Sequence, residues 1–544
     1  MKRNTCVFLC FFLLLAGCAT REKEKEQSSS YYEIVMQWPG EGSAYSGLSQ
    51  VEEAVNAITE KEIGARIKLL PSMSTTFDAN MMIQKGQKLD LCVSLFGEMP
   101  SLIENHYLME LDGLLETQGQ RLKQICGVQL LGGSYQDHVY GIPCCFTEGV
   151  RYGFLCRTDL LRKYGIYSEE EKLYSFDELE AFFDRVMEGE NQKEGEEGKE
   201  TDEEIEEETE KETEERTEEE TEKETEKEAE TEKEELYILG GNLVTQYHFM
   251  ERAEHPMDTL GSDVGTGVLL LDTKEGQEGK IVNYYETEAF AAFATRMYRW
   301  NQKGFFLPDT AMSEYSPNAL MREQKTIGWF FSNVPGEEIE NTLDSGWECS
   351  FLPTQEAVRY TDTYQVALWS IPITCQNPEK TMAFLSLLYT DRRVSNLLQR
   401  GIEDVSYVVA QKGEEGSEDM TIALPPGETI DTIPYYEYLN VFGNRMDIYD
   451  WDPLPLSRKE KLRSFDENVR LSAPSLGYVF NRQTVSAEID KIQAVERKYL
   501  GLIETGVVDP ATQLPLFLEE LKAAGIEKVI EENQRQYDDW RSRG

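Results

Sequence analysis

The sequence lacks the patterns that mark the common catalytic sites. It contains no Gly-x-Ser-x-Gly nucleophile motif, no His-Glu-x-x-His zinc motif, no phosphate-binding P-loop and no Gly-x-Gly-x-x-Gly after a strand. Histidine is scarce, with four residues in 544. His248 and His255, even with Glu251 between them, offer fewer well-placed ligands than zinc usually takes. The sequence therefore predicts no catalytic residue, no metal and no cofactor.

Carboxylate pairs that hydrolyse glycosides are the exception to this reasoning. They are recognised by their distance in space, and acidic residues are abundant throughout the chain. Nothing in the sequence singles out one pair. A secreted glycosidase therefore stays open as an alternative function.

Positive charge is also in short supply, with 54 Lys and Arg against 101 Asp and Glu, a net charge of −47 and a pI near 4.5. This balance argues against nucleic acid as a partner, because phosphates require a basic surface. About 27 acids and about seven bases lie in residues 188–235, roughly half of the net charge. This Glu/Lys/Thr tract has almost no apolar residue, which favours a disordered insertion in a surface loop over a solvent-exposed helix.

The cysteines do not have the number and spacing of a disulfide framework. Three of the ten cysteines lie in the first 18 residues, and the seven in the body are an odd number at irregular spacings. Several of them lie in apolar runs. We expect them to be buried small hydrophobic residues rather than disulfide partners.

A long apolar run is missing as well. Residues 7–15 form an apolar stretch of only about ten residues, against the roughly 20 that cross a bilayer. It follows Lys2 and Arg3 and precedes Leu15-Ala-Gly-Cys18, the order of a secretion signal. The last four residues resemble the lipobox of bacterial lipoproteins, which implies a signal peptide over 1–17, a diacylglyceryl anchor on Cys18 and a solvated tether over 18–30. The rest of the chain would then be anchored to the cell membrane and face outside the cytoplasm.

The body begins with a strand, helix, strand unit. Residues 33–37 and 65–70 are apolar strands, and the helix between them is predicted to start at a capping box formed by Ser49 and Glu52. Such a unit predicts a sheet that is parallel at its centre. Open parallel sheets bind ligands beyond the carboxyl ends of their strands, where Trp38, Glu41 and, after a later strand, Phe96 are expected.

Helices and strands alternate through the remainder. The Ser175-x-x-Glu178 spacing is a capping signal that predicts a helix over 176–187. Asn377 and Pro378 are a second capping signal, and they predict a helix over 381–389. Apolar periodicity predicts a helix over 289–300 and strands over 325–331 and 366–373. From residue 487 the tail is expected to be helical, with breaks near Gly506 to Pro510 and at Gly525.

Aromatic residues recur near the ends of the predicted strands. Trp329 and Trp369 either pack in a core or stack on the C–H face of a sugar, since a Trp ring needs both apolar cover and a partner for its N–H. Glu148 stands in a strand-like segment, where it is either solvated or placed to meet a polar ligand. The residues alone leave both alternatives open.

Several motifs together resemble a known family. They are Tyr140-Gly-Ile-Pro143, Arg157-Thr-Asp-Leu-Leu, the Ser175-Phe-Asp-Glu-Leu179 helix start, Asn377-Pro-Glu-Lys-Thr-Met-Ala-Phe-Leu, Phe442-Gly-Asn444 and Gln534-Arg-Gln-Tyr-Asp-Asp-Trp540. From Tyr31 to Trp540 the chain resembles the extracellular solute-binding lipoproteins of ABC importers, carbohydrate type, with its carboxyl-terminal region similar to the LipO-like subgroup.

The resemblance implies an α/β, two-lobe, periplasmic-binding-protein-like fold of type II with crossover segments and a helical C-terminal tail. One lobe would comprise 31–142 and 372–474 and the other 143–369 and 475–544, with the acidic insertion in the second. The ligand-binding residues that it implies are Trp38, Glu41, Phe96, Glu148, Trp329, Trp369, Tyr407, Asn444 and Tyr478.

The implied function is capture of a saccharide or sugar derivative by lobe closure and delivery to the ABC permease. The implied partners are the solute, the permease and, through the lipid on Cys18, the membrane, with the protein itself a monomer and not an enzyme. Besides the glycosidase, an adhesin or sensor without a transport role is an alternative.

Overall fold

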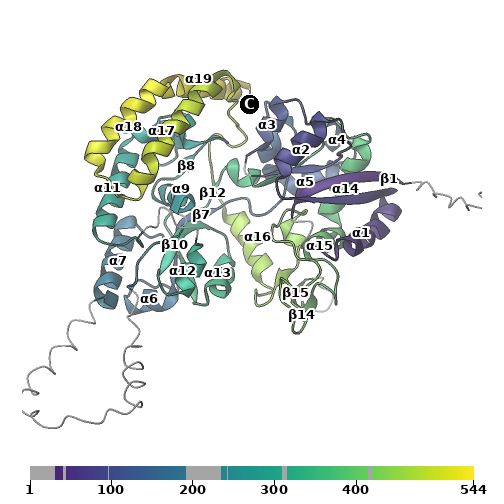
Figure 1. Cartoon of the computed structure of the whole chain (residues 1–544), viewed down its shortest axis with the longest axis horizontal. Coiled ribbons are helices and arrows are strands. Elements are labelled where there is room, and N and C mark those ends of the chain that lie inside the picture. The colour runs from purple at the N-terminus through teal and green to yellow at the C-terminus, as the bar shows by residue number, and fades with distance from the viewer. Residues whose placement is uncertain are drawn as a thin grey trace, which may run out of the picture.

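The chain folds into two lobes joined by three crossing segments (Figure 1). The computed structural model describes residues 31–40, 45–95, 97–191, 235–241, 243–308, 315–413 and 419–543. The predicted signal peptide, the tether with Cys18 and almost all of the acidic insertion therefore lie outside the described residues. We call the half that contains β1 the N-lobe and the half that contains β7 the C-lobe.

The N-lobe is built on a mixed sheet. β1 (Tyr32–Pro39) pairs in parallel with β2 (Ala65–Ser72), and Met36 of β1 bridges in parallel to Leu91, just before β3 (Cys92–Leu95). β13 (Ala367–Ser370) then pairs antiparallel with both β3 and β6 (Ile142–Pro143). The predicted parallel strand, helix, strand unit is thus confirmed, and a strand from late in the sequence completes the sheet.

The predicted capping box at the start of the first helix is wrong. Helix α1 (Leu48–Glu62) begins one residue before Ser49, with Gly47 at its N-cap and no capping side chain. Glu52 instead accepts a hydrogen bond from the Leu69 backbone N–H at 2.9 Å. Its carboxylate ties the helix to β2, which the spacing of Ser and Glu cannot reveal.

Helices cover this sheet, and their apolar residues merge into one buried cluster around Trp38, Trp369 and Leu385. The remaining N-lobe elements are α2 (Thr75–Gln84), α3 (Met99–Glu104), α4 (Asp112–Leu115), α5 (Gln120–Cys126), β4 (Ser134–Tyr135), β5 (His138–Val139), α14 (Pro378–Thr390), α15 (Arg392–Arg400), β14 (Val408–Lys412), β15 (Met420–Ala423), β16 (Asp450–Trp451) and α16 (Arg458–Asn468).

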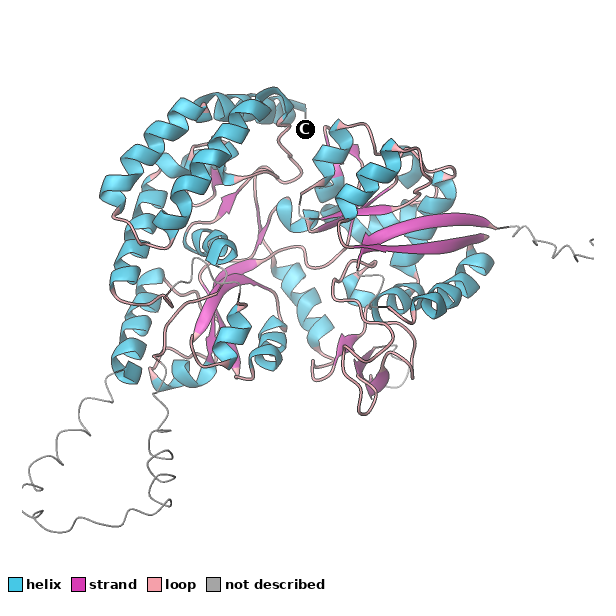
Figure 2. Cartoon of the chain, viewed as in Figure 1, coloured by secondary structure: helices cyan, strands magenta, loops and turns pink. Residues whose placement is uncertain are grey.

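The C-lobe contains a second, antiparallel sheet in the order β10-β7-β11 (Figure 2). Its strands are β7 (Arg151–Arg157), β10 (Gly328–Asn333) and β11 (Cys349–Pro353). On one face, Phe330 stacks on Phe176 with ring centroids 5.3 Å apart. This face packs against α7 (Phe176–Asn191) and α11 (Glu288–Gln302), both close to their predicted positions.

The predicted capping box at Ser175 is confirmed. Glu178 N–H donates to Ser175 Oγ at 3.2 Å, and Ser175 N–H donates to the Glu178 carboxylate at 2.9 Å. The other C-lobe elements are α6 (Thr158–Lys163), α9 (Leu243–Glu254), β8 (Met257–Asp258), β9 (Leu269–Leu270), α10 (Lys274–Gln277), α12 (Pro317–Arg322), α13 (Glu337–Ser345), β12 (Val358–Arg359) and β17 (Leu471–Ser472).

The C-terminal tail forms three helices on the C-lobe, α17 (Ser486–Glu504), α18 (Pro510–Ala524) and α19 (Ile526–Arg543). The breaks between them fall where the sequence predicts them. Phe517 and Tyr537 are fully buried, so the helices belong to the C-lobe core. The far end of α19 reaches the other lobe, where Arg543 pairs with Asp137 (Figure 1).

The crossing segments run from β6 to β7, from β12 to β13 and from α16 to β17. β12 pairs in parallel with β17, and Val150 bridges antiparallel to Val358, so the three segments lie side by side. Figure 1 shows α16 between the two lobes, next to these segments. Among the described residues, no helix combines the length and the apolar character needed to span a bilayer.

Candidate functional site

A cleft lies between the lobes and consists of two adjoining chambers. The large chamber has a volume of about 820 Å³ and the small chamber about 370 Å³. Val150, Ser332, Thr363 and Val366 line both, so the chambers meet at the crossing segments. Each chamber by itself lies within the roughly 300–1,000 Å³ that small-molecule sites use.

Both lobes contribute walls to the large chamber. Thr76, Glu98 and Ser101 come from the N-lobe, at the ends of strands β2 and β3. The opposite wall is formed by α9, by the loop after β8 and by the crossing segment around Asp362. A molecule held here would touch both lobes.

The floor of the large chamber holds an ion pair between buried Arg252 and partly exposed Asp362. Arg252 on α9 donates from Nη1 to Tyr152 Oη at 2.6 Å and from Nη2 to Asp362 Oδ2 at 2.5 Å, and its side chain is 3% exposed. Its Nε and the second oxygen of Asp362 are buried without a hydrogen-bond partner. These two atoms are one donor and one acceptor that lie unpaired beside the chamber.

His248 lies beside this pair. Burial first, and then the positive charge of Arg252, lower the pKa of the imidazole to about 4. The ring is therefore neutral at neutral pH. With Phe249 it gives the large chamber a partly aromatic wall.

The small chamber is lined by polar groups that lack partners. The Thr147 hydroxyl, the Asn333 amide nitrogen and Arg458 Nε are buried and make no hydrogen bond. Each of these side chains belongs to a residue that is 2% exposed. Because buried polar groups are normally paired, three orphaned groups around one cavity make this chamber a candidate ligand site.

Apolar groups complete this chamber. Phe146, Val334, Leu439 and Val441 line it, and the Arg445 guanidinium lies 5.7 Å from the Phe146 ring centroid. Glu337, at the start of α13, also lines it, and burial raises the pKa of its carboxyl group to about 8. Glu337 is therefore mostly protonated at neutral pH and can donate a hydrogen bond.

The three tryptophans predicted to bind ligand lie in lobe interiors. Trp38 and Trp369 are fully buried in the N-lobe, where their N–H groups donate to Glu437 at 2.8 Å and to the Val441 carbonyl at 2.7 Å. Trp329 is 6% exposed and packs with Leu155 and Met321. None of the three lines a chamber.

Glu148 lies in the first crossing segment, between the chamber-lining residues Thr147 and Val150. Its carboxylate accepts hydrogen bonds from Arg359, and its carbonyl accepts one from Tyr364 Oη at 2.6 Å. It thus joins two crossing segments beside the cleft and lines neither chamber.

The remaining predicted residues are scattered. Asn444 caps a short 3₁₀ turn next to Asn440 and Arg445, which line the small chamber. Tyr407 is buried against Tyr449, with ring centroids 6.3 Å apart. Tyr478 lines a separate cavity of about 610 Å³ between α19 and residues 131–137. Glu41 and Phe96 lie outside the described residues.

Sequence reasoning missed the charged residues of the cleft. Arg252, Asp362, Arg445 and Arg458 stand in stretches that read as ordinary solvated polar sequence, and only the fold brings them to the cleft, where Arg252 and Arg458 are buried. Asn333 carried a weak signal, because it is the polar last residue of an otherwise largely apolar strand.

The seven described cysteines are all free, and six of them are buried. This confirms their interpretation as small core residues. Within the described part of the chain, no group of three or more His, Cys, Asp or Glu side chains could hold a metal ion. His255 instead lies 2.9 Å from Asp272.

Comparison with solved structures assigns the fold to the two-lobe solute-binding proteins, as the sequence predicts. The N-glycan transport solute-binding protein NgtS of Streptococcus pneumoniae superimposes with a TM-score of 0.71 at 19% identity, over 93% of this chain and 98% of that one. The ABC-transporter substrate-binding protein FusA in complex with kestose, from the same organism, superimposes with a TM-score of 0.52 at 14% identity, over 94% of this chain and 100% of that one.

A curated relative is also similar in sequence. A carbohydrate ABC transporter substrate-binding protein of Streptococcus pneumoniae is 28% identical over 293 residues, which are 52% of this chain. The match spans 56% of the length of that relative. Residues 474–542, which include α17 to α19, match the family described as a domain of unknown function, DUF3502.

Proposed function

We propose that the protein is the solute-binding component of an ABC importer and that it captures a saccharide in the cleft. The observation that carries this proposal is the cleft itself. Its walls come from both lobes and from the crossing segments, and both polar and apolar side chains line it. The relatives support it, since NgtS has been solved with Man1GlcNAc and with Man5GlcNAc.

The chemistry of the large chamber suits a neutral polyhydroxy ligand. The orphaned Arg252 Nε and Asp362 oxygen provide a fixed donor and acceptor, and Tyr152 and Phe249 provide apolar ring surface. Release of the ligand unchanged is the expected outcome, as in a solute-binding component of an importer.

Closure would follow from the arrangement of the lobes. A solute that touches the N-lobe wall and the C-lobe wall together binds the closed form better than the open form, and this difference shifts the population towards closure. The closed form would then be presented to the permease. The signal peptide would direct export and be removed, and the lipid on Cys18 would then hold the protein on the outer side of the cell membrane.

The test uses the chain from residue 31 onward and a panel of mono- and oligosaccharides. We expect at least one glycan to raise the melting temperature and to bind saturably by calorimetry, with no product detectable by chromatography. Product formation would favour the glycosidase instead. If no small solute stabilises the fold, the adhesin or sensor is favoured.

A matched pair of variants links binding to the cleft. Val366 lines both chambers and is 51% exposed, so Val366→Trp should fill the cleft with little effect on folding. Leu343, 52% exposed on α13, lines neither chamber, and Leu343→Trp is the control. We expect the first to lose binding by at least about tenfold and the second to retain it.

A further inference from the structure

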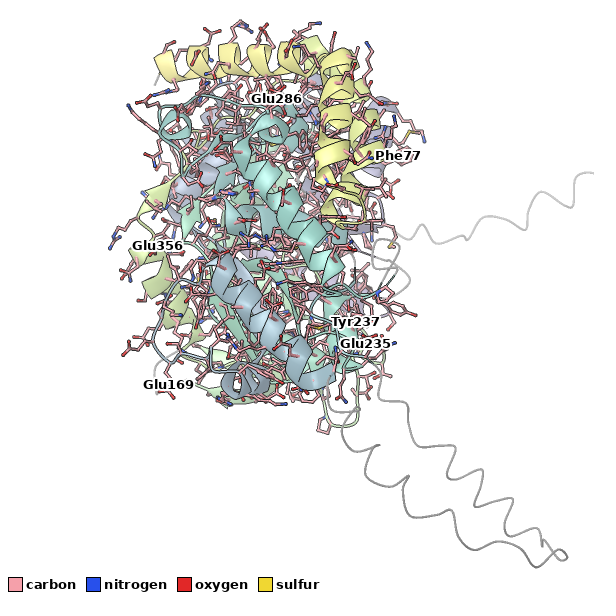
Figure 3. All side chains as sticks on the ribbon, turned by 90° about the vertical axis from the view of Figure 1, so that its left-hand side faces the viewer. Phe77, Glu169, Glu235, Tyr237, Glu286 and Glu356 are labelled. Carbon is pink, nitrogen blue, oxygen red and sulfur yellow. The ribbon has the colours of Figure 1, made fainter. Side chains whose placement is uncertain are left out.

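The small chamber has two arginines and two acids, Glu337 and Glu340, in its wall. Arg445 and Arg458 line it, and Arg400 lies behind them, with its Nε donating to the Tyr449 carbonyl at 2.9 Å. Outside the cleft, the acids Glu169, Glu286 and Glu356, labelled in Figure 3, are exposed.

The ion pairs within the chamber wall do not balance this charge. Arg458 donates to Asp450 at 3.1 Å and lies 3.3 Å from Glu340, and Arg445 lies 3.8 Å from the same two acids. Two carboxylates thus face three guanidinium groups. The third acid, Glu337, is held largely neutral by burial, which raises the pKa of its carboxyl group.

The orphaned groups, like the incompletely balanced arginines, favour an anionic ligand. Arg458 Nε and the Asn333 amide nitrogen can only donate, and the Thr147 hydroxyl can donate as well. A buried, incompletely balanced guanidinium cluster with three free donors matches a planar anion that accepts several hydrogen bonds. A carboxylate has this geometry, and it would remove the cost of leaving these groups unpaired.

We propose that the small chamber binds a carboxylate on the captured solute, so that the preferred ligand is an acidic saccharide rather than a neutral one. This inference rests on the proposed function, since the sugar body would occupy the large chamber. The two chambers meet at Val150 and Val366, which allows one ligand to reach both.

The experiment compares neutral disaccharides with the aldobiouronic acids of the same linkage, in which the terminal hydroxymethyl group is a carboxylate. Calorimetry on the chain from residue 31 onward gives the ratio of the two affinities. We expect the acid of at least one pair to bind about tenfold tighter, the effect of one charge-assisted hydrogen-bond set. Equal binding, or tighter binding of the neutral sugar, would overturn the inference and leave the proposed function standing.

Two substitutions locate the effect. Asn333→Asp keeps the side-chain shape and places a negative charge in the chamber, so the affinity ratio should fall to about one. Thr147→Val removes one donor at constant shape and should lower the ratio by a smaller factor. Gln118→Glu, on an exposed N-lobe residue, adds the same charge elsewhere and should leave the ratio unchanged.

Two other results of these measurements would contradict the proposed carboxylate site. If the ratio survives in Asn333→Asp, the carboxylate lies elsewhere and the inference is wrong. If neither series binds at millimolar concentration, the proposed function fails for these glycans and the inference fails with it. A melting curve of each variant separates loss of binding from loss of folding.

Discussion

Arg359 donates two hydrogen bonds to one oxygen of the Glu148 carboxylate, from Nε at 2.9 Å and from Nη2 at 2.6 Å. The same guanidinium donates from Nη1 to the Val469 carbonyl at 2.9 Å, and the Glu148 backbone N–H donates to Asp466 at 2.7 Å. Residues from all three connections between the lobes therefore meet in one hydrogen-bonded group. This group fixes how the crossing segments lie against one another.

We predict that Glu148 and Arg359 are energetically coupled. Glu148→Gln and Arg359→Gln should each lower the free energy of unfolding by about 1 to 3 kcal/mol, because the pair is charge-assisted and partly buried. Urea unfolding of both single variants and of the double variant gives the coupling energy. The exposed pair Arg162 and Glu348 is the control and should contribute less than about 1 kcal/mol. Coupling no larger than that of the control would contradict the prediction.

Asp466 makes the stability of this group depend on pH. Burial, and to a lesser extent the negative charge of Glu148, raises the pKa of the Asp466 carboxyl group to about 6, above the roughly 3.9 of an unfolded chain. The folded state therefore binds more protons between about pH 4 and pH 6, and this group's contribution falls as pH rises through that window.

Asp466→Asn should remove that dependence. The variant keeps an oxygen that accepts the Glu148 N–H, and it should gain stability relative to the natural chain as pH rises from 4 to 7. Melting temperatures across this range measure the difference, with the exposed Glu467→Gln as the control. A constant difference at all pH values would show that Asp466 does not titrate in this window.

The backbone of Gly336 packs closely against the Arg458 side chain. Its φ is +98°, and a Cβ at this position would lie 2.3 Å from Arg458 Nε. Gly336→Ala should therefore lower the free energy of unfolding by more than about 2 kcal/mol, through backbone strain and displacement of the buried guanidinium. Gly346, at the other end of α13, has φ +77° and nothing within 4 Å, so Gly346→Ala should cost about 1 kcal/mol from strain alone. Equal losses would mean that the contact with Arg458 is unimportant.

Trp329 tests the sequence prediction of a sugar-stacking ring. In the structure it packs within the C-lobe beside Met321 and Cys349, so Trp329→Phe should cost about 1 to 3 kcal/mol of stability. We expect the glycan affinity of the folded variant, measured by calorimetry, to stay within about threefold of the natural chain. A loss of tenfold or more would instead place this ring against the solute.

The thiols provide a test of core packing. Burial raises the pKa of Cys92 to about 12, and the other described thiols are also free. Under native conditions alkylation should be slow for the six buried cysteines and fastest at Cys144, which is partly exposed. After denaturation without reductant, the mass of the chain from residue 31 onward should rise by seven adducts. Fewer adducts would reveal a disulfide.

Local signals in the sequence determined a large part of the fold. Alternating and helical apolar periodicity located β1, β2, α7, α11 and the tail helices, because these elements bury one face and place their caps nearby. Ser175 with Glu178 formed the expected cap, whereas Ser49 with Glu52 did not, since Glu52 is drawn to the neighbouring strand. The motifs shared with a known family supplied the two-lobe arrangement.

Only the tertiary structure decided which side chains face the cleft. Trp38 and Trp369 follow the pattern of ligand-binding aromatics in sequence, yet packing from distant segments covers both rings. Arg252, Asn333 and Arg458 look like ordinary polar residues in the sequence. They line chambers because three separate crossings bring segments that are hundreds of residues apart into contact. Apolar periodicity depends on residues that are close in the sequence, so the sequence predicted the helices and strands of the scaffold. Burial of a charged side chain depends on residues that are far away in the sequence, so only the fold determined the site.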